Sequence, residues 1–200
     1  MAFERWKRPA ILSATLLLCG LGAWISNGLL QLHDGLPQTS SPARRLIAHL
    51  CHSDSEESSG CTASARSPWA EIRLPVPTHP VDVPVAFLAI AYFVALGVWY
   101  AFVGDAQLKG KWIRWLPMVL AAMGIYASLF FVGLMAMGRS PWCYVCVAVH
   151  SINLLLVIAI WLGRRFARVE DGPVAAVNCR QVAAVVAFAI LLISLLLNKL

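Results

Sequence analysis

Charged side chains are scarce in this chain of 200 residues, of which only 13% are Asp, Glu, Lys or Arg. Soluble domains usually carry about 25%. Hydrophobic residues make up 60%, which is more apolar surface than a chain this short can hide in a water-soluble core. The shortage of charge therefore excludes an ordinary soluble domain and predicts an integral membrane protein.

The positive balance of the chain, a formal net charge of +6, does not indicate a nucleic-acid partner. Lys and Arg gather at the ends of apolar runs, a pattern that reports membrane topology rather than a surface for polyanions. We therefore expect contact with membrane lipid and no nucleic acid.

Five stretches are apolar enough to cross a membrane, since about 20 apolar residues span its hydrocarbon core. They are Ala10–Leu32, Val83–Gly104, Trp115–Gly138, Pro141–Gly163 and Gln181–Leu197. Helices suit them better than barrel strands, which would alternate with period two. The first is too long for the apolar part of a signal peptide, so we expect it to be retained. The sequence predicts an all-α integral membrane fold.

The loop charges predict the orientation of these helices, because short cytoplasmic loops carry the excess of Lys and Arg. The more basic side holds Arg5, Lys7, Arg8, Lys109, Lys111, Arg114, Arg164, Arg165, Arg168 and Arg180. The other side holds Arg44, Arg45, Arg66, Arg73, Arg139 and Lys199. We expect a cytoplasmic N-terminus, with the loop 33–82 and the turn 139–142 outside.

The external loop 33–82 has three parts. Residues 42–50 place Leu and Ile on one side with Arg nearby, which is typical of a short interfacial helix. Residues 52–60 are polar and acidic and are predicted to be mobile. After Cys61 a run of prolines favours extended backbone over the membrane face.

Four of the six cysteines fall on the predicted external side of the membrane. Cys143-Tyr-Val-Cys146 begins the fourth helix, and its spacing places both sulfurs in the first turn, near enough for a reversible disulfide. The unpaired N–H groups and the dipole of a helix start favour a thiolate, the nucleophile of disulfide exchange. Cys19 and Cys179 are interpreted as ordinary buried residues without a redox role.

The residues missing around Cys143 and Cys146 argue against other chemistries. Haem attachment requires His directly after the second cysteine, and that residue is Val147. A zinc site requires more ligands, and the chain holds no second C-x-x-C. We therefore expect no metal here, with half of a zinc site as the less favoured interpretation.

Cys51 and Cys61 flank the acidic segment and allow two interpretations. One is a static loop disulfide, which is common in exported segments. The other is a pair on a flexible tether that meets a soluble partner and the Cys143–Cys146 pair in turn. We favour the second, because the loop holds little that a structural bond would order.

Two dithiol pairs in series predict electron transfer between a soluble protein and a two-electron carrier in the lipid. The chain has no haem, flavin or iron–sulfur motif, so a quinone is the natural carrier. His150 lies one helical turn beyond Cys146, and an ionisable residue inside a membrane helix is a functional candidate. It either donates a hydrogen bond or proton to a quinone oxygen or bonds to another helix. For Asn153 the second interpretation is favoured.

The order of these features resembles the vitamin K epoxide reductase (VKOR) family over roughly Arg5–Gly163. A first helix, a loop cysteine pair, Ser67-Pro68-Trp69-Ala70 and two further helices precede the C-x-x-C that opens the fourth helix. The resemblance implies a four-transmembrane-helix bundle around a quinone pocket, for ubiquinone or menaquinone. Residues 1–163 would form this catalytic core, and residues 164–200 a basic cytoplasmic loop and a fifth transmembrane helix.

The same resemblance implies an enzyme of the bacterial inner membrane with its active site in the periplasm. Such an enzyme oxidises a separate thioredoxin-like (DsbA-like) protein and passes the electrons to quinone, supporting disulfide-bond formation. The implied catalytic residues are Cys51, Cys61, Cys143 and Cys146, with Cys146 nearest the quinone. Ser67, Trp69 and His150 are the implied quinone contacts, although a Trp at a membrane interface is more often an anchor.

Three features depart from the family pattern. Nine residues separate the loop cysteines, His150 stands where some members have tyrosine, and no fused thioredoxin domain follows the fifth helix. We therefore expect a separate partner protein. Three other functions stay open: reduction of vitamin K epoxide or quinone as the main role, a non-enzymatic membrane subunit with static disulfides, and a small transporter. The transporter is least favoured, because His150 is the only intramembrane ionisable residue predicted.

Overall fold

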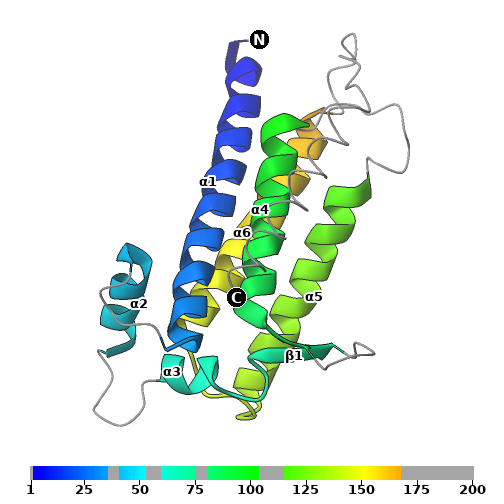
Figure 1. The fold of residues 1–200 in the computed structure, drawn as a ribbon. Helices are drawn as coiled ribbons and strands as arrows, with labels where there is room; N and C mark the ends of the chain where they lie inside the picture. The colour runs from blue at the N-terminus through cyan, green and yellow to red at the C-terminus, as the bar shows by residue number, and fades with distance from the viewer. Residues whose placement is uncertain (1, 36–40, 53–59, 75–80, 104–114, 168–200) are drawn as a thin grey trace. The chain divides into compact units, whose positions relative to one another are not determined.

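The computed structural model describes residues 2–35, 41–52, 60–74, 81–103 and 115–167 (Figure 1). The predicted fifth helix, Gln181–Leu197, lies outside these residues, as do Cys179 and the acidic segment between the loop cysteines. Six of the sixteen basic residues that predict the orientation also lie outside the described ranges.

Four long apolar helices confirm the predicted helical membrane fold. They are α1 (Ala2–His33), α4 (Val85–Phe102), α5 (Leu116–Ala136) and α6 (Tyr144–Ala167). Each contains a stretch of 18 to 24 residues that is long and apolar enough to cross a membrane. The described part of the chain therefore supplies four spans of the kind that the sequence predicts.

The apolar surface of these helices is mostly left outside the protein. Only 17% to 33% of the most apolar window of each span is buried. Leu17, Tyr126 and Leu129 are about 70% exposed or more. In water such side chains would be costly, whereas in a bilayer they face lipid tails of similar polarity. Their exposure therefore supports a membrane location.

Contacts divide the chain into two units, and each long helix contributes residues to both. The first unit comprises residues 1–20, 91–125 and 154–200. Its fully buried side chains include Phe93, Leu96 and Leu156. Cys19 is a buried free thiol in this unit, where a Cβ at Gly97 would lie 3.3 Å from the Cys19 Cβ. This close approach of α1 and α4 fits the prediction that Cys19 is a packing residue.

The second unit comprises residues 21–90 and 126–153 and holds every element between α1 and α4 that the structure describes. The predicted interfacial helix is α2 (Pro42–His52), with Pro42 at its first position, where the missing N–H costs nothing. A Cβ at Gly28 would meet the Ile47 side chain and lie 3.2 Å from the Ala43 carbonyl. The glycine in α1 thus lets α2, which ends just after Cys51, pack closely.

Residues after Cys61 form more structure than the proline content predicts. A short helix, α3 (Gly60–Ala65), leads into β1 (Glu71–Leu74) and β2 (Val81–Pro84). The strands are antiparallel, with Glu71 opposite Pro84 and Leu74 opposite Val81. The expectation of extended backbone is therefore right for these two segments, but their pairing into a hairpin was not predicted.

A tight turn carries the chain from α5 into α6. Gly138 has a φ of 67°, a left-handed conformation that glycine adopts without steric cost. The Gly138 and Arg139 N–H groups donate to carbonyls in the last turn of α5 at 3.1 and 2.9 Å. The turn supplies hydrogen bonds to carbonyl groups in the last turn of α5, and it fixes where the C-x-x-C helix begins.

Candidate redox site and pocket

The four cysteines of the two predicted redox pairs form two disulfides in the second unit. Cys51 is bonded to Cys61 with a Cα–Cα distance of 5.9 Å, and Cys143 to Cys146 with 5.2 Å. Both distances fall in the usual range for disulfides, about 4.4–6.8 Å. The pairs that the sequence singles out are therefore the pairs that the fold brings into bonding distance.

The two sulfurs of the C-x-x-C motif occupy different surroundings. Cys143 is the residue before α6, it is 0% exposed, and its Sγ accepts a hydrogen bond from the Cys146 N–H at 3.1 Å. It therefore caps the helix, in the position where an unpaired N–H can stabilise a thiolate. Cys146 is only partly buried and lines a pocket. One disulfide thus joins a capped, enclosed sulfur to a sulfur that a small molecule can reach.

Cys143 shares an apolar cluster with both loop cysteines. Cys51, Cys61 and Cys143 are each 6% exposed or less and pack in one group with Ile47 and Met135. A sulfur buried in this cluster is shielded from bulk thiols but lies among the other sulfurs. The packing favours exchange between the two pairs over random exchange with solvent thiols.

Gly60 sets the approach of the loop pair to the C-x-x-C motif. A Cβ at this position would collide with the backbone carbonyl oxygen of Trp142 and lie 3.2 Å from its carbon. Gly60 directly precedes Cys61, and Trp142 directly precedes Cys143. The absence of a side chain at Gly60 therefore lets the backbone beside Cys61 lie against the backbone beside Cys143.

We expect Gly60→Ala to slow electron transfer from the loop pair to the Cys143–Cys146 pair, by up to about a hundredfold if the displacement reaches 1 Å. The added methyl group must push α3 away from a backbone atom that cannot yield easily. The measurement is rapid quenching with an alkylating agent, which reports the redox state of each pair after a dithiol is added. Gly20→Ala is the control, since nothing lies within 4 Å of a Cβ there. Equal transfer rates in both variants would show that this approach is unimportant.

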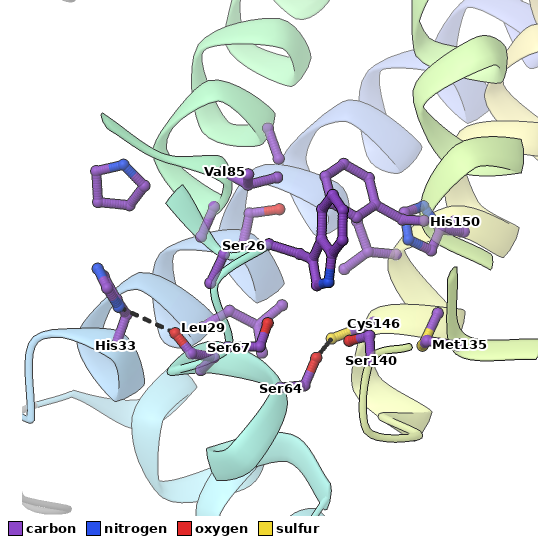
Figure 2. Close-up of a pocket in the computed structure, with 18 residues that line it drawn as sticks. Ser26, Leu29, His33, Ser64, Ser67, Val85, Met135, Ser140, Cys146 and His150 are labelled. Atoms are coloured by element: carbon purple, nitrogen blue, oxygen red, sulfur yellow. Dashed lines mark hydrogen bonds between the residues drawn. The ribbon is translucent and has the colours of Figure 1, made fainter. Parts of the chain in front are cut away.

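The pocket beside Cys146 has a cavity of about 120 Å³ (Figure 2). A single ordered water needs roughly 10–15 Å³ by this measure, so the space is large enough for a ring-sized molecule. Its walls are mostly apolar, with a few serine and histidine side chains. Such a lining is typical of sites for flat apolar ligands that carry a few polar groups.

His33 holds the external segments against the end of α1 at the edge of this pocket. Its Nδ1 lies 3.0 Å from the Ala65 carbonyl oxygen, and its Nε2 lies 3.1 Å from the Glu71 carboxylate. One side chain therefore links α1 to the end of α3 and to the start of β1. The bond to Ala65 is drawn in Figure 2.

Ser64 connects α3 with the C-x-x-C motif. Its hydroxyl lies 3.9 Å from the Cys146 sulfur (Figure 2). Ser64 stands one turn after Cys61, so the helix that carries a loop cysteine also places a hydroxyl beside Cys146. A hydroxyl in this position can donate to Cys146 when that sulfur becomes a thiolate.

His150 belongs to a polar network inside the membrane segment. Asn153 Nδ2 donates to Ser128 Oγ at 2.9 Å, and the same Oγ lies 3.1 Å from His150 Nδ1. In the tautomer in which Ser128 Oγ donates to Nδ1, a neutral His150 carries its ring proton on Nε2. Phe131 stacks on the imidazole, with ring centroids 6.2 Å apart and planes at 11°.

The three residues predicted to contact a quinone all line the pocket with Cys146. They are Ser67, Trp69 and His150. Trp69 is 38% exposed and packs edge-on against Phe130, with ring centroids 6.2 Å apart. His150 bonds to another helix through Ser128, as one interpretation predicts, and it also lines the pocket; its donation to a quinone stays a prediction.

Sequence reasoning missed several pocket residues. Ser26 and His33 come from α1, Ser64 from α3, and Ser140 from the turn before α6. Serine is common in membrane helices and has no spacing rule that marks it as a ligand. The one available signal was His33, an ionisable residue at the end of an apolar run. Among the described residues, no group of three or more His, Cys, Asp or Glu side chains could hold a metal ion.

The protein has four apolar spans, a buried loop disulfide and a C-x-x-C disulfide that opens onto an apolar pocket. These features are typical of a membrane protein of the disulfide oxidoreductase class. The vitamin K epoxide reductase family matches the chain over residues 13–161. The chain therefore belongs to this family, which confirms the resemblance in the sequence. No curated protein and no solved structure gives a significant match.

Proposed function

We propose that this VKOR-family membrane oxidoreductase oxidises a thioredoxin-like protein outside the cytoplasm and passes the electrons to a quinone. The observation that carries the proposal is the position of Cys146, which belongs to the C-x-x-C disulfide and also lines the ring-sized pocket. Electrons that reach this pair can leave it only to an oxidant in contact with one of its sulfurs. Cys146 is the sulfur with such access.

The first exchange takes place at the loop pair. A reduced partner attacks the Cys51–Cys61 disulfide, its own two thiols become a disulfide, and both loop cysteines become thiols. Because the backbone beside Cys61 lies against the backbone beside Cys143, Cys61 is the better placed of the two for the next step. Cys51 is then the cysteine that bonds to the partner.

The second exchange moves the electron pair to the pocket. The Cys61 thiolate attacks the Cys143 sulfur, the Cys143–Cys146 bond breaks, and Cys146 leaves as a thiolate beside the Ser64 hydroxyl. Cys51 then attacks Cys61, which restores the loop disulfide and releases Cys143. The C-x-x-C pair now holds the two electrons and two protons that the partner lost.

The pocket suits a quinone as the final acceptor. A bound quinone takes up two electrons and two protons, and the C-x-x-C disulfide forms again. The apolar walls suit a flat ring, and the Nε2–H of His150 can donate to a carbonyl oxygen, where negative charge develops. Trp69 and Ser67 add an aromatic wall and a hydroxyl. Ubiquinone and menaquinone both satisfy these requirements.

The bacterial inner membrane is the location that fits this function. The four spans and the external disulfides require a lipid bilayer that borders an oxidising compartment. With the N-terminus in the cytoplasm, as the loop charges predict, the cysteine pairs face the periplasm. The partner is then a separate periplasmic protein of the thioredoxin type.

Trapping of the partner tests the order of exchange. In the Cys61→Ser variant, the Cys51 thiol should form a stable mixed disulfide with a thioredoxin-like protein that lacks its second cysteine and whose remaining cysteine is activated as a disulfide with thionitrobenzoate, which is the leaving group. Cys51→Ser should trap much less, because Cys61 is directed at Cys143. Non-reducing electrophoresis measures both adducts. Equal trapping by the two variants would remove the assigned order, and stronger trapping by Cys51→Ser would reverse it. No adduct with either variant would contradict a thioredoxin-like partner.

A further inference from the structure

A serine in α1 points to a specific contact with the ligand of the pocket. Ser26 is 1% exposed and lines the same pocket as Cys146 and His150 (Figure 2). Its hydroxyl has no hydrogen-bond partner among the residues that the structure describes. Of the side-chain atoms around this pocket, it is the one that is fully buried and unpaired in the described part of the chain. Native proteins rarely leave such an atom unsatisfied.

Two other hydroxyls in the spanning helices are satisfied by their own helix. Thr15, also in α1 and also 1% exposed, donates to the Ile11 carbonyl at 2.8 Å. Ser151 in α6 donates to the Val147 carbonyl at 2.9 Å. This bond to the carbonyl four residues earlier is the usual choice for a helical serine or threonine in an apolar setting. Ser26 does not make it, so its hydroxyl is left for a group inside the pocket.

The neighbouring polar groups around the pocket do not supply the partner. His33 bonds to Ala65 and Glu71, and Ser64 is directed at the Cys146 sulfur. His150 uses Nδ1 for Ser128, and its Nε2 has no partner among the described residues. Ser26 Oγ and His150 Nε2, on different helices, therefore remain for a ligand, together with the less buried hydroxyls of Ser67 and Ser140.

We propose that the Ser26 hydroxyl donates a hydrogen bond to one oxygen of the quinone while His150 Nε2 donates to another. The inference rests on the proposed function and extends it, since two donors on separate helices recognise a flat dicarbonyl rather than any apolar ring. Ser26 then acts in ligand selection and orientation. It takes no part in the exchange of disulfides.

The test combines ligand affinity with stability, measured on the full chain in detergent with both disulfides oxidised. Removal of an unpaired hydroxyl should not lower the stability of the quinone-free protein, whereas removal of a ligand contact should weaken quinone binding. For Ser26→Ala we expect a Kd for 2-methyl-1,4-naphthoquinone three- to tenfold higher, as loss of one neutral hydrogen bond gives. Quenching of tryptophan fluorescence measures the Kd, and Trp69 in the pocket wall is a suitable reporter. The Tm without quinone should be unchanged or higher.

Thr15→Val is the matched control, because it removes a hydroxyl that does have a helical partner. It should leave the Kd unchanged and lower the Tm. Ser26→Cys, which nearly keeps the shape, should bind quinone less well than the parent protein with an unchanged Tm.

Three results would overturn the inference in distinguishable ways. An unchanged Kd in Ser26→Ala, with the parent protein binding quinone, would remove Ser26 from the site and leave the proposed function standing. A lower Tm in quinone-free Ser26→Ala would show that the hydroxyl has a structural partner. No binding of quinone by the parent protein would refute the proposed function, and this contact with it.

Discussion

Cys146→Ser is expected to abolish quinone reduction, with a loss of at least about a thousandfold, as removal of a nucleophile that acts in a unit produces. Cys146 is the member of the C-x-x-C pair that lines the pocket, whereas Cys143 is fully enclosed. Serine cannot form the disulfide that accepts the electron pair. The measurement is the ultraviolet absorbance of a short-chain quinone after a reduced thioredoxin-like protein is added.

The same variant should accumulate a trapped intermediate. Without Cys146 the remaining Cys143 thiol can attack Cys61, which the backbone contact at Gly60 places near it; the Cys51–Cys61 bond breaks and Cys51 is released as a thiol. Mass spectrometry of the unreduced protein should detect a Cys61–Cys143 crosslink. Cys19→Ala is the control, because Cys19 is a free thiol buried in the other unit of the chain and its loss should be nearly silent. Quinone reduction retained in Cys146→Ser would remove this sulfur from the mechanism.

His150→Phe is expected to weaken quinone binding and to lower the rate of quinone reduction about a hundredfold, the lower range for a lost proton donor. Phenylalanine keeps an aromatic ring to stack on Phe131 but removes the Nε2–H that the pocket offers. Both disulfides should still form, because His150 touches neither pair. The measurement is kcat and KM for quinone, together with an assay of free thiols.

Two further variants distinguish loss of the His150 donor from loss of the Ser128 hydrogen bond that orients its ring. Ser128→Ala should reduce the rate by a smaller factor, about tenfold, because it frees the ring from its hydrogen bond without removing the donor. Ser151→Ala is the control, since its hydroxyl bonds to its own helix on an exposed face. An unchanged kcat and KM for quinone in His150→Phe would show that His150 has only a structural role, in its hydrogen-bond network with Ser128.

The sequence predicts the spans and the cysteine pairs well, because each follows from a local rule. A run of about 20 apolar residues that crosses a bilayer by itself can pair its backbone N–H and C=O groups in hydrogen bonds only as a helix. The second predicted span, Val83–Gly104, therefore differs from α4 by two residues at each end. The fourth span was predicted to open near Pro141, whereas α6 begins at Tyr144, since Cys143 is used as the cap.

The features that the sequence could not predict depend on contacts between distant residues. The β1–β2 hairpin gains a cross-strand ion pair between Arg73 and Asp82 at 3.0 Å, and no local pattern announces that register. His33 bonds to a carbonyl 32 residues away. Gly60 and Ser26 matter only because of what lies opposite them in space.

The central claim is that one electron path joins an external dithiol to a quinone through both disulfides. The most direct test uses the purified full chain in detergent, without oxygen, with a reduced thioredoxin-like protein and a short-chain quinone. We predict that one partner dithiol is oxidised for each quinone reduced, and that Ser at position 51, 61, 143 or 146 stops this coupled reaction. Partner and quinone that both stay unchanged, with the two disulfides intact, would instead show that these bonds are static and would contradict the account.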